Sequence, residues 1–149
     1  MFVVAISWPV FYTLPSRVRA VCFWGFSGFE RFVLLEDPKT APFCWFQSLE
    51  EPNLALVLMS PFLFKPDYEI DLKGFIASRG WENVETKDLL VYVVINITKG
   101  EGVNKITANL IGPIIINLKT NEAIQVAVSN SNYSHRHNVL ESSWKIKKK

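Results

Sequence analysis

Eight short runs rich in β-branched and aromatic residues recur along the chain, and the turn-forming residues between them constrain the fold more than any other feature. Runs of this length and composition favour extended strands, whereas the Gly, Pro, Asn and Asp residues that separate them favour turns. The runs cover residues 18–24, 30–35, 43–49, 54–59, 89–98, 105–111, 114–118 and 122–129. Many short strands with hairpin-length links predict a mainly β fold, either an antiparallel sandwich or a barrel.

The whole chain, residues 1–149, is predicted to form a single domain. Its length is typical of one domain with its own core, and 49% hydrophobic against 20% charged residues is typical of a compact protein. No repeat, low-complexity stretch or linker divides it.

Only residues 71–80 favour a helix. Asp71 can cap the N-terminus, apolar residues at 72, 75 and 76 share one face, and Gly80 can end the helix. We therefore expect a short helix over residues 72–79, which would cover one opening of the β structure.

The stretch "TANLIGPIIINLKTNEAIQVAV", residues 107–128, predicts a bend followed by a hairpin. Gly112-Pro113 ends one strand and starts another at an angle, as at a barrel corner. If the even-numbered apolar residues on both sides of the turn share a face, Ile116 pairs with Ile124 and residues 119–121 form the loop. Asn121 would then be left-handed, and Asn117 would pair with Ala123 on a face near solvent.

The charge distribution argues against a nucleic-acid-binding body. The formal charge of +2 includes four lysines, Lys145, Lys147, Lys148 and Lys149, and the remainder has 12 basic against 14 acidic residues. Between Glu30 and Glu101 there are twelve acidic against seven basic residues, which is not the basic footprint that nucleic acid requires. The lysine tail, residues 141–149, is expected to be solvated and flexible.

Residues 1–20 do not resemble a membrane span or a signal peptide. The uncharged run is too short to span, Pro9 interrupts it, and Arg17 and Arg19 follow the apolar run instead of preceding it. We expect a cytoplasmic protein without a membrane partner. Cys22 and Cys44 lack metal-ligand spacing and are interpreted as buried thiols.

A search for catalytic or cofactor motifs finds no Gly-rich phosphate loop, paired-histidine metal helix or nucleophile elbow. His135 and His137 share a face if extended, but no third ligand lies close in sequence, so a structural or surface role is favoured over a metal site. Asp67, Glu69 and Asp71 alternate along one face and are expected to form a solvated acidic surface that could meet a basic partner. No cofactor, metal or reaction is predicted.

The segment "SPFLFKPDYEI" is the strongest candidate for binding a macromolecule. Two prolines stiffen the backbone, so large rings can be presented with little loss of entropy on association. The alternative is that the rings fill the barrel. We expect a mixture, with Phe62 or Phe64 pointing inward and Tyr68 near the surface.

Three blocks in order resemble the flagellar assembly factor FliW family: "FCWFQSL" at 43–49, "PFLFKPDY" at 61–68, and "TANLIGPIIIN" at 107–117 followed by "YSHRH" at 133–137. The resemblance runs from about Val21 to Leu140. It departs from the family in the first 20 residues, in Trp24 and Ser27 where prolines are usual, in Gly112 where alanine is common, and in the lysine tail.

The resemblance implies a small, cytoplasmic, β-barrel-like protein that is not an enzyme. Family members bind flagellin before export and bind the RNA-binding regulator CsrA, which relieves repression of flagellin translation. Such control by partner exchange requires two binding free energies of similar size. No direct nucleic-acid contact and no cofactor are implied.

Two other classes stay open from the residues themselves. One is an independent RNA- or single-stranded-DNA-binding barrel that uses exposed aromatics and the lysine tail. The other is an enzyme whose site is assembled from residues distant in sequence, and no motif in the sequence supports this class. The predicted partner-binding residues are Phe62, Phe64, Asp67, Tyr68, Asn109 and Asn117, the two asparagines being either polar contacts or fasteners of the bend and turn.

Overall fold

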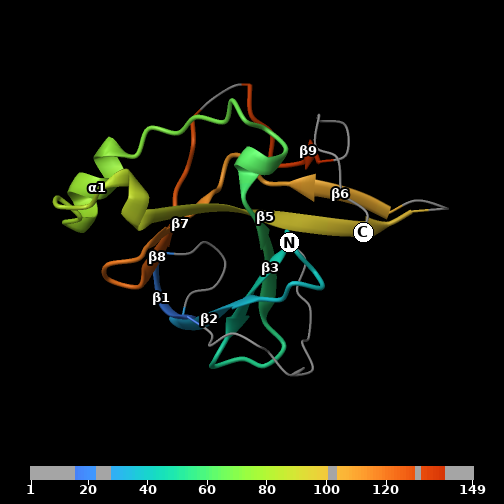
Figure 1. Ribbon diagram of the computed structural model, residues 1–149, viewed down its shortest axis with the longest axis horizontal. Helices are drawn as coiled ribbons and strands as arrows, with labels where there is room; N and C mark the ends of the chain where they lie inside the picture. Colours follow the sequence, from blue (N-terminus) through green and yellow to red (C-terminus); the bar gives the residue numbers. More distant parts are fainter. Residues whose placement is uncertain (1–15, 23–27, 101–103, 130–131, 140–149) are drawn as a thin grey trace.

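The computed structural model describes residues 16–22, 28–100, 104–129 and 132–139 (Figure 1). The strands are β1 Ser16–Cys22, β2 Arg31–Glu36, β3 Cys44–Ser48, β4 Ala55–Met59, β5 Leu89–Lys99, β6 Asn104–Ala108, β7 Ile114–Asn117, β8 Glu122–Gln125 and β9 His137–Asn138. One α-helix, α1 Lys73–Arg79, and two 3-10 helices, η1 Pro61–Leu63 and η2 Thr86–Asp88, lie in the connections. Trp24, Ser27, the uncharged N-terminal run and the lysine tail lie outside the described residues.

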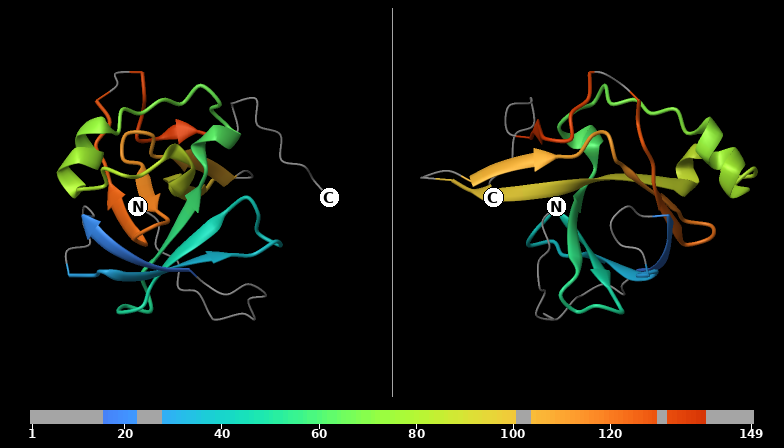
Figure 2. Two further views of the ribbon diagram at one scale, coloured as in Figure 1. Left: turned by 60° about the vertical axis from the view of Figure 1, so that its left-hand side comes forward. Right: turned by 180° about the vertical axis from the view of Figure 1, so that it is seen from behind.

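The strands form one sheet that closes into a barrel. Their order is β4-β3-β2-β1-β8-β7-β5-β6-β9, and β4 also pairs with β5 through Leu58 with Val94 and Met59 with Val93. That pairing closes a ring of seven strands, β4-β3-β2-β1-β8-β7-β5. The C-terminal half of β5 extends beyond the ring and carries β6 and β9, as the rear view in Figure 2 shows. The predicted barrel-like β fold is confirmed.

One pairing in the ring is parallel, although the sequence predicted an antiparallel sheet. Strand β1 runs parallel to β8, with Arg19 opposite Glu122 and Ala20 opposite Ala123. About a hundred residues separate the two strands, so no hairpin dictates their direction. The other pairings in the sheet are antiparallel.

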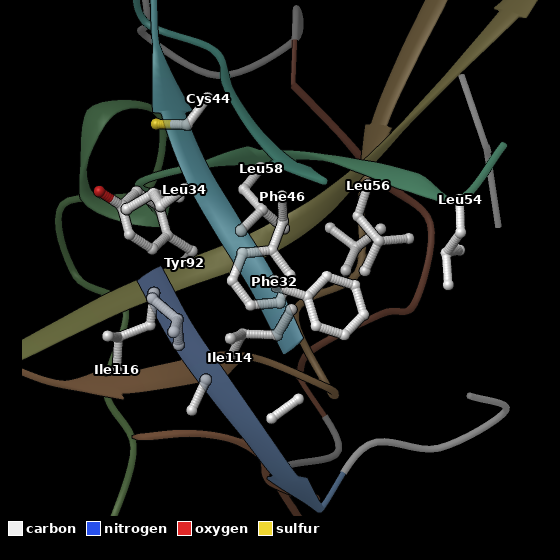
Figure 3. Packing of buried hydrophobic residues seen from close by; sticks show 14 residues of the cluster. Phe32, Leu34, Cys44, Phe46, Leu54, Leu56, Leu58, Tyr92, Ile114 and Ile116 are labelled. Atoms are coloured by element: carbon white, nitrogen blue, oxygen red, sulfur yellow. The ribbon is translucent and has the colours of Figure 1, made fainter. Parts of the chain in front are cut away.

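The barrel interior is packed with large apolar side chains (Figure 3). The rings of Phe32 on β2 and Phe46 on β3 stack face to face, with centroids 4.5 Å apart and planes 5° from parallel. Neither ring is exposed, and aliphatic side chains of β4 and β7 surround them, including Leu56, Leu58 and Ile114. The interior is therefore filled by side chains and leaves little room for a ligand.

Parts of the barrel are also covered from outside. Residues 61–70 and Val139 pack over the outward faces of β4 and β5, against Met59 and Ile95. Trp81 and the apolar face of α1 pack over β7 and β8, against Ile115 and Ile124. Strands β4 and β7 are consequently buried on both faces, which is why their sequences are apolar without alternation.

The predicted register of the β7–β8 hairpin is wrong by one residue. Ile115, not Ile116, pairs with Ile124, and Asn117 pairs with Glu122, which leaves a four-residue loop, 118–121. The parity argument assumed one buried face, but both faces of β7 are buried, so parity does not select the register. Asn117, predicted near solvent, is completely buried. Asn121 does take the predicted left-handed conformation, with φ of 55°.

The predicted helix is confirmed over Lys73–Arg79, and Gly80 ends it in the left-handed region with φ of 72°. Its place is not the predicted one. It covers the outer face of β7 and β8 instead of an opening of the barrel, because its apolar residues Phe75 and Ile76 pack against Trp81 and the outward side chains of those strands.

The bend predicted at Gly112-Pro113 is a bulge between two strands that pair with β5. Ile95 faces Ala108 and Tyr92 faces Ile114. Three residues along β5 are therefore matched by six residues along the segment that runs from β6 to β7. The extra residues let β6 and β7 both pair with β5 while the chain changes direction.

We expect Phe46→Ala to lower the free energy of unfolding by about 3–5 kcal/mol, because it opens a cavity in the filled interior and removes the stacked ring. Phe62→Ala, which removes the same side chain from an exposed position, is the matched control and should cost about 0.5 kcal/mol or less. Denaturant unfolding of the two variants measures both. Equal losses would contradict the assignment of the interior core.

Candidate partner-binding site

A groove of about 960 Å³ lies outside the barrel, over the N-terminal half of β5. One side is formed by residues 68–73 and Phe75 of α1, another by the extended chain after β8, residues 126–129, and Phe62 lies at its rim. Its lining is mostly apolar, with Ile70, Leu72, Phe75, Val91 and Val128, and the exposed carboxylates of Glu69 and Asp71 lie beside them. We call this feature the β5 groove.

Phe62 is held outward by the short helix η1. Pro61 starts the helix, and its carbonyl accepts hydrogen bonds from the backbone N–H of Phe64 at 3.3 Å and of Lys65 at 2.9 Å. This turn buries Phe64 and leaves Phe62 46% and Leu63 45% exposed. Two large neighbouring apolar side chains in water, of which Phe62 lines the groove, suit a protein-binding surface.

Phe64 is the ring that points inward, as predicted for one of the two phenylalanines. It is buried in the outer core cluster, and its ring stacks on His137 with centroids 5.7 Å apart. His137 is half-buried in β9, whereas His135 is exposed. His137 therefore packs against the outer core cluster, and His135 lies at the surface.

Tyr68 was predicted near the surface, and this prediction is wrong, because only 4% of the residue is exposed. Its hydroxyl donates a 2.6 Å hydrogen bond to the carbonyl of Leu110 in the bulge, and its ring lies 4.9 Å from that of Tyr133. Burial raises the pKa of Tyr68 far above its usual value, so the hydroxyl stays protonated and keeps donating. The ring also forms part of the groove wall.

Asp67 lies in solvent, with 79% of its side chain exposed and Lys65 Nζ 3.3 Å away. Glu69 and Asp71 are also exposed, so the predicted solvated acidic surface is confirmed. The segment that carries them is irregular and not a strand. An acidic rim beside an apolar groove would attract a partner with basic residues around an apolar segment.

The two asparagines fasten turns. Asn109 Oδ1 accepts hydrogen bonds from the backbone N–H of Ile111 at 3.2 Å and of Gly112 at 3.1 Å, which holds the bulge. Asn117 Oδ1 accepts from Lys119 N at 2.9 Å in the β7–β8 loop. Of the six predicted residues, the structure brings Phe62, Phe64, Asp67 and Tyr68 to one side of the molecule. It places Asn109 in the bulge, and Asn117 apart, opposite Leu89 of β5.

Sequence reasoning missed Glu122, which ties α1 to the barrel. Its carboxylate accepts hydrogen bonds from Arg19 of β1 at 2.8 Å, from Trp81 Nε1 at 3.1 Å and from Arg79 of α1 at 3.3 Å. These donors, Arg19 foremost, hold the pKa of the Glu122 carboxyl below its usual value. The partners are far apart in sequence, so only a predicted parallel pairing of β1 with β8 could have indicated the cluster.

The thiol of Cys44 lies beside Tyr92 at a cavity of about 380 Å³, and burial raises its pKa to about 11. A thiol with this pKa is protonated near neutral pH and is a poor nucleophile. The buried thiol predicted at Cys44 is confirmed, and the side chain of Cys22 lies outside the described residues.

The described ranges contain no group of three or more His, Cys, Asp or Glu side chains that could hold a metal ion. They also contain no helix that is long and apolar enough to cross a membrane.

The fold and the groove place the chain in the class of small β-barrel proteins in which one sheet closes and then extends sideways. The model of the FliW protein family matches residues 21–139. The chain therefore belongs to the family of the flagellar assembly factor FliW. A flagellar assembly factor FliW from Treponema denticola is 40% identical over 79% of this chain and 78% of that protein.

Other relatives and a solved structure agree with this assignment. A flagellar assembly factor FliW from Caldanaerobacter subterraneus subsp. tengcongensis is 38% identical over 78% of this chain and 77% of that protein. A crystal structure of the flagellar assembly factor FliW superimposes with a TM-score of 0.69, at 32% identity over 83% of this chain and 85% of that one. The predicted family resemblance is confirmed.

Tyr68→Phe should lower the free energy of unfolding by about 1–2 kcal/mol, because it removes the donor to the Leu110 carbonyl in a buried place. Tyr133→Phe is the matched control. Its hydroxyl accepts from Glu69 N at 2.7 Å in a more exposed place, where water can replace it, so the loss should be smaller. Thermal and denaturant unfolding would show the difference, and a larger loss for Tyr133→Phe would be inconsistent with this packing.

Glu122→Gln should destabilise the protein by about 1–2 kcal/mol at neutral pH, where the ionised carboxylate binds Arg19 and Arg79. The folded-state pKa lies below the usual 4.5, so the ionised group contributes stability above the unfolded-state pKa. This contribution is lost as the pH falls through the folded-state pKa. The stability gap between the two proteins should therefore narrow in acid.

The control for this pH dependence is Asp67→Asn, which removes an exposed carboxylate beside Lys65 and should change stability little at any pH. Unfolding free energies at neutral and acid pH measure both variants. A gap for Glu122→Gln that is constant with pH would contradict the linkage.

Proposed function

We propose that this chain acts in the cytoplasm as a flagellar assembly factor by binding flagellin before export and by binding the translational regulator CsrA, with the two partners in exchange. When flagellin occupies the protein, CsrA is free to repress flagellin synthesis, and export of flagellin reverses this. Membership of the FliW family supports the proposal. No reaction is assigned to the chain.

The observation that carries a binding function is the apolar rim of the β5 groove. Phe62 and Leu63 are nearly half exposed beside a largely apolar lining, and desolvating such side chains against a partner supplies most of the free energy of a typical interface. A rigid frame adds affinity because few rotamers are lost on association. The groove is framed by Tyr68, which the bulge holds, and by α1, which Glu122 holds.

The exposed carboxylates beside the groove favour a partner with basic residues. Asp67, Glu69 and Asp71 lie along the segment between η1 and α1, with Lys65 and Lys73 as the cations of that segment. Opposite charges raise the association rate and disfavour partners with acidic surfaces. The same carboxylates oppose phosphate, so this groove does not favour an RNA- or single-stranded-DNA-binding barrel.

Phe62→Ala should weaken binding of at least one partner about tenfold or more, because an exposed aromatic at the rim of a groove is a typical hot spot. Titration calorimetry with purified flagellin and with purified CsrA measures this, and adding one partner to the complex with the other tests exchange. Leu118→Ala is the matched control, since Leu118 is 48% exposed but does not line the groove.

The outcomes separate the function from the site. If the unaltered protein binds neither flagellin nor CsrA, the proposed function is wrong. If it binds both but Phe62→Ala has no more effect than Leu118→Ala, the function stands and the β5 groove is not the interface.

A further inference from the structure

A second, smaller cavity of about 180 Å³ lies at one mouth of the barrel. Val94 of β5 belongs to the interior cluster, and Asn96, two residues later, lies on the same face beyond it. Ala123 and Gln125 of β8 are related in the same way. The cavity is therefore the polar end of the apolar interior, and β-barrel mouths are a common place for ligands.

The far wall of this mouth pocket comes from the bulge and from the segment before β9. Asn109 contributes an oriented amide, because its Oδ1 already accepts the N–H groups of Ile111 and Gly112. Its Nδ2 lies over Gly112, close to the side-chain amide of Gln125. Gly112 makes this arrangement possible, since a Cβ there would lie 3.0 Å from Asn109 Nδ2 and 3.1 Å from Gln125 Nε2.

His135 and Arg136 complete the lining, on a segment that is held at several points. The carbonyl of Ser134 accepts from Leu110 N at 3.0 Å, and Ser134 Oγ accepts from Arg136 N at 3.0 Å. One residue further on, the ring of His137 stacks on Phe64. The segment therefore presents Arg136 at a defined place.

The charge balance of the pocket is one-sided. Its lining contains the Arg136 guanidinium, the His135 imidazole and the side-chain amides of Asn96, Asn109 and Gln125, and none of the described residues that line it is acidic. Within the described ranges Arg136 forms no ion pair with a carboxylate, whereas Arg19 and Arg79 both pair with Glu122. The pocket thus offers a cation and neutral donors without an internal anion.

From this geometry we propose that the mouth pocket binds a carboxylate group of a polypeptide. The planar guanidinium matches a carboxylate with two parallel N–H donors, and the Asn96 and Asn109 amides can donate to the remaining lone pairs. Among the described lining residues Arg136 is the permanently charged one, and with the neutral amides it balances one negative charge, which suits a carboxylate better than a doubly charged phosphate. The proposal is independent of the β5 groove and of the function proposed above.

A polypeptide carboxylate has two sources, the chain terminus and an acidic side chain, and three peptides distinguish them. The probes are acetyl-Gly-Gly-Gly with a free terminal carboxylate, the same peptide amidated, and amidated acetyl-Gly-Glu-Gly. Each is titrated into the full chain labelled with ¹⁵N, and the side-chain amide signals of Asn96 and Asn109 are followed by NMR. Both signals should shift with a peptide that carries a carboxylate and not with the amidated triglycine.

Binding of the free-acid peptide alone identifies a chain terminus, and binding of the Glu peptide alone identifies a side chain. Either result, or binding of both, supports the pocket. Arg136→Gln should weaken binding about tenfold or more, because it removes the charged donor. Arg136 lies on an exposed connection, so this variant should fold normally.

Lys105→Gln is the matched control, since it removes one exposed positive charge from β6 without altering the pocket lining. An equal loss of binding with Lys105→Gln would overturn the proposal, because it would show general charge attraction. Equal binding of the amidated triglycine, no amide shift with any carboxylate, or tighter binding of inorganic phosphate would also overturn it.

Discussion

The bulge between β6 and β7 is the constraint on which the rest of the structure depends. Residues 110–113 leave the regular ladder with β5, so their backbone polar groups need partners elsewhere. Those partners come from three distant segments: the hydroxyl of Tyr68 donates to the Leu110 carbonyl, the Ser134 carbonyl accepts from Leu110 N, and Gln125 Nε2 donates to the Gly112 carbonyl at 3.0 Å. The bonds from Tyr68 and to Ser134 fix two connections on the barrel, and the bond from Gln125 joins the bulge to β8.

Both candidate surfaces take their geometry from these few hydrogen bonds. On one side, the bond from Tyr68 fixes a wall of the β5 groove. On the other, Asn109 faces the mouth pocket because its oxygen is occupied by the bulge, and the segment carrying Arg136 is anchored to Leu110. A change in the bulge would therefore alter both surfaces together, whereas a change at Phe62 or Arg136 would alter one.

The predictions from sequence succeeded where the pattern is local and failed where burial depends on distant chain. Turn residues and strand-length runs placed the strands to within a few residues, and Gly80 marked the end of α1 correctly. The predicted register of β7 with β8 was wrong because α1 and Trp81 cover a face that an isolated hairpin would expose. The prediction that Tyr68 lies near the surface was wrong for the same reason. Its hydroxyl suggested contact with solvent, but it donates to the buried carbonyl of Leu110, which is 42 residues away in sequence. The Glu122 cluster required a parallel pairing that no local pattern indicates.

Covering the outer faces of the barrel also determines where recognition can occur. Both faces of β4 and of β7 are buried, so the side chains of these two strands are not accessible to a partner. Both candidate surfaces accordingly use exposed groups on connections, Phe62 on η1 and Arg136 before β9. These connections are still rigid, because each is bonded to the bulge or packed on the barrel. Their substitution should change binding with little change in stability, and substitution in the strands should do the reverse.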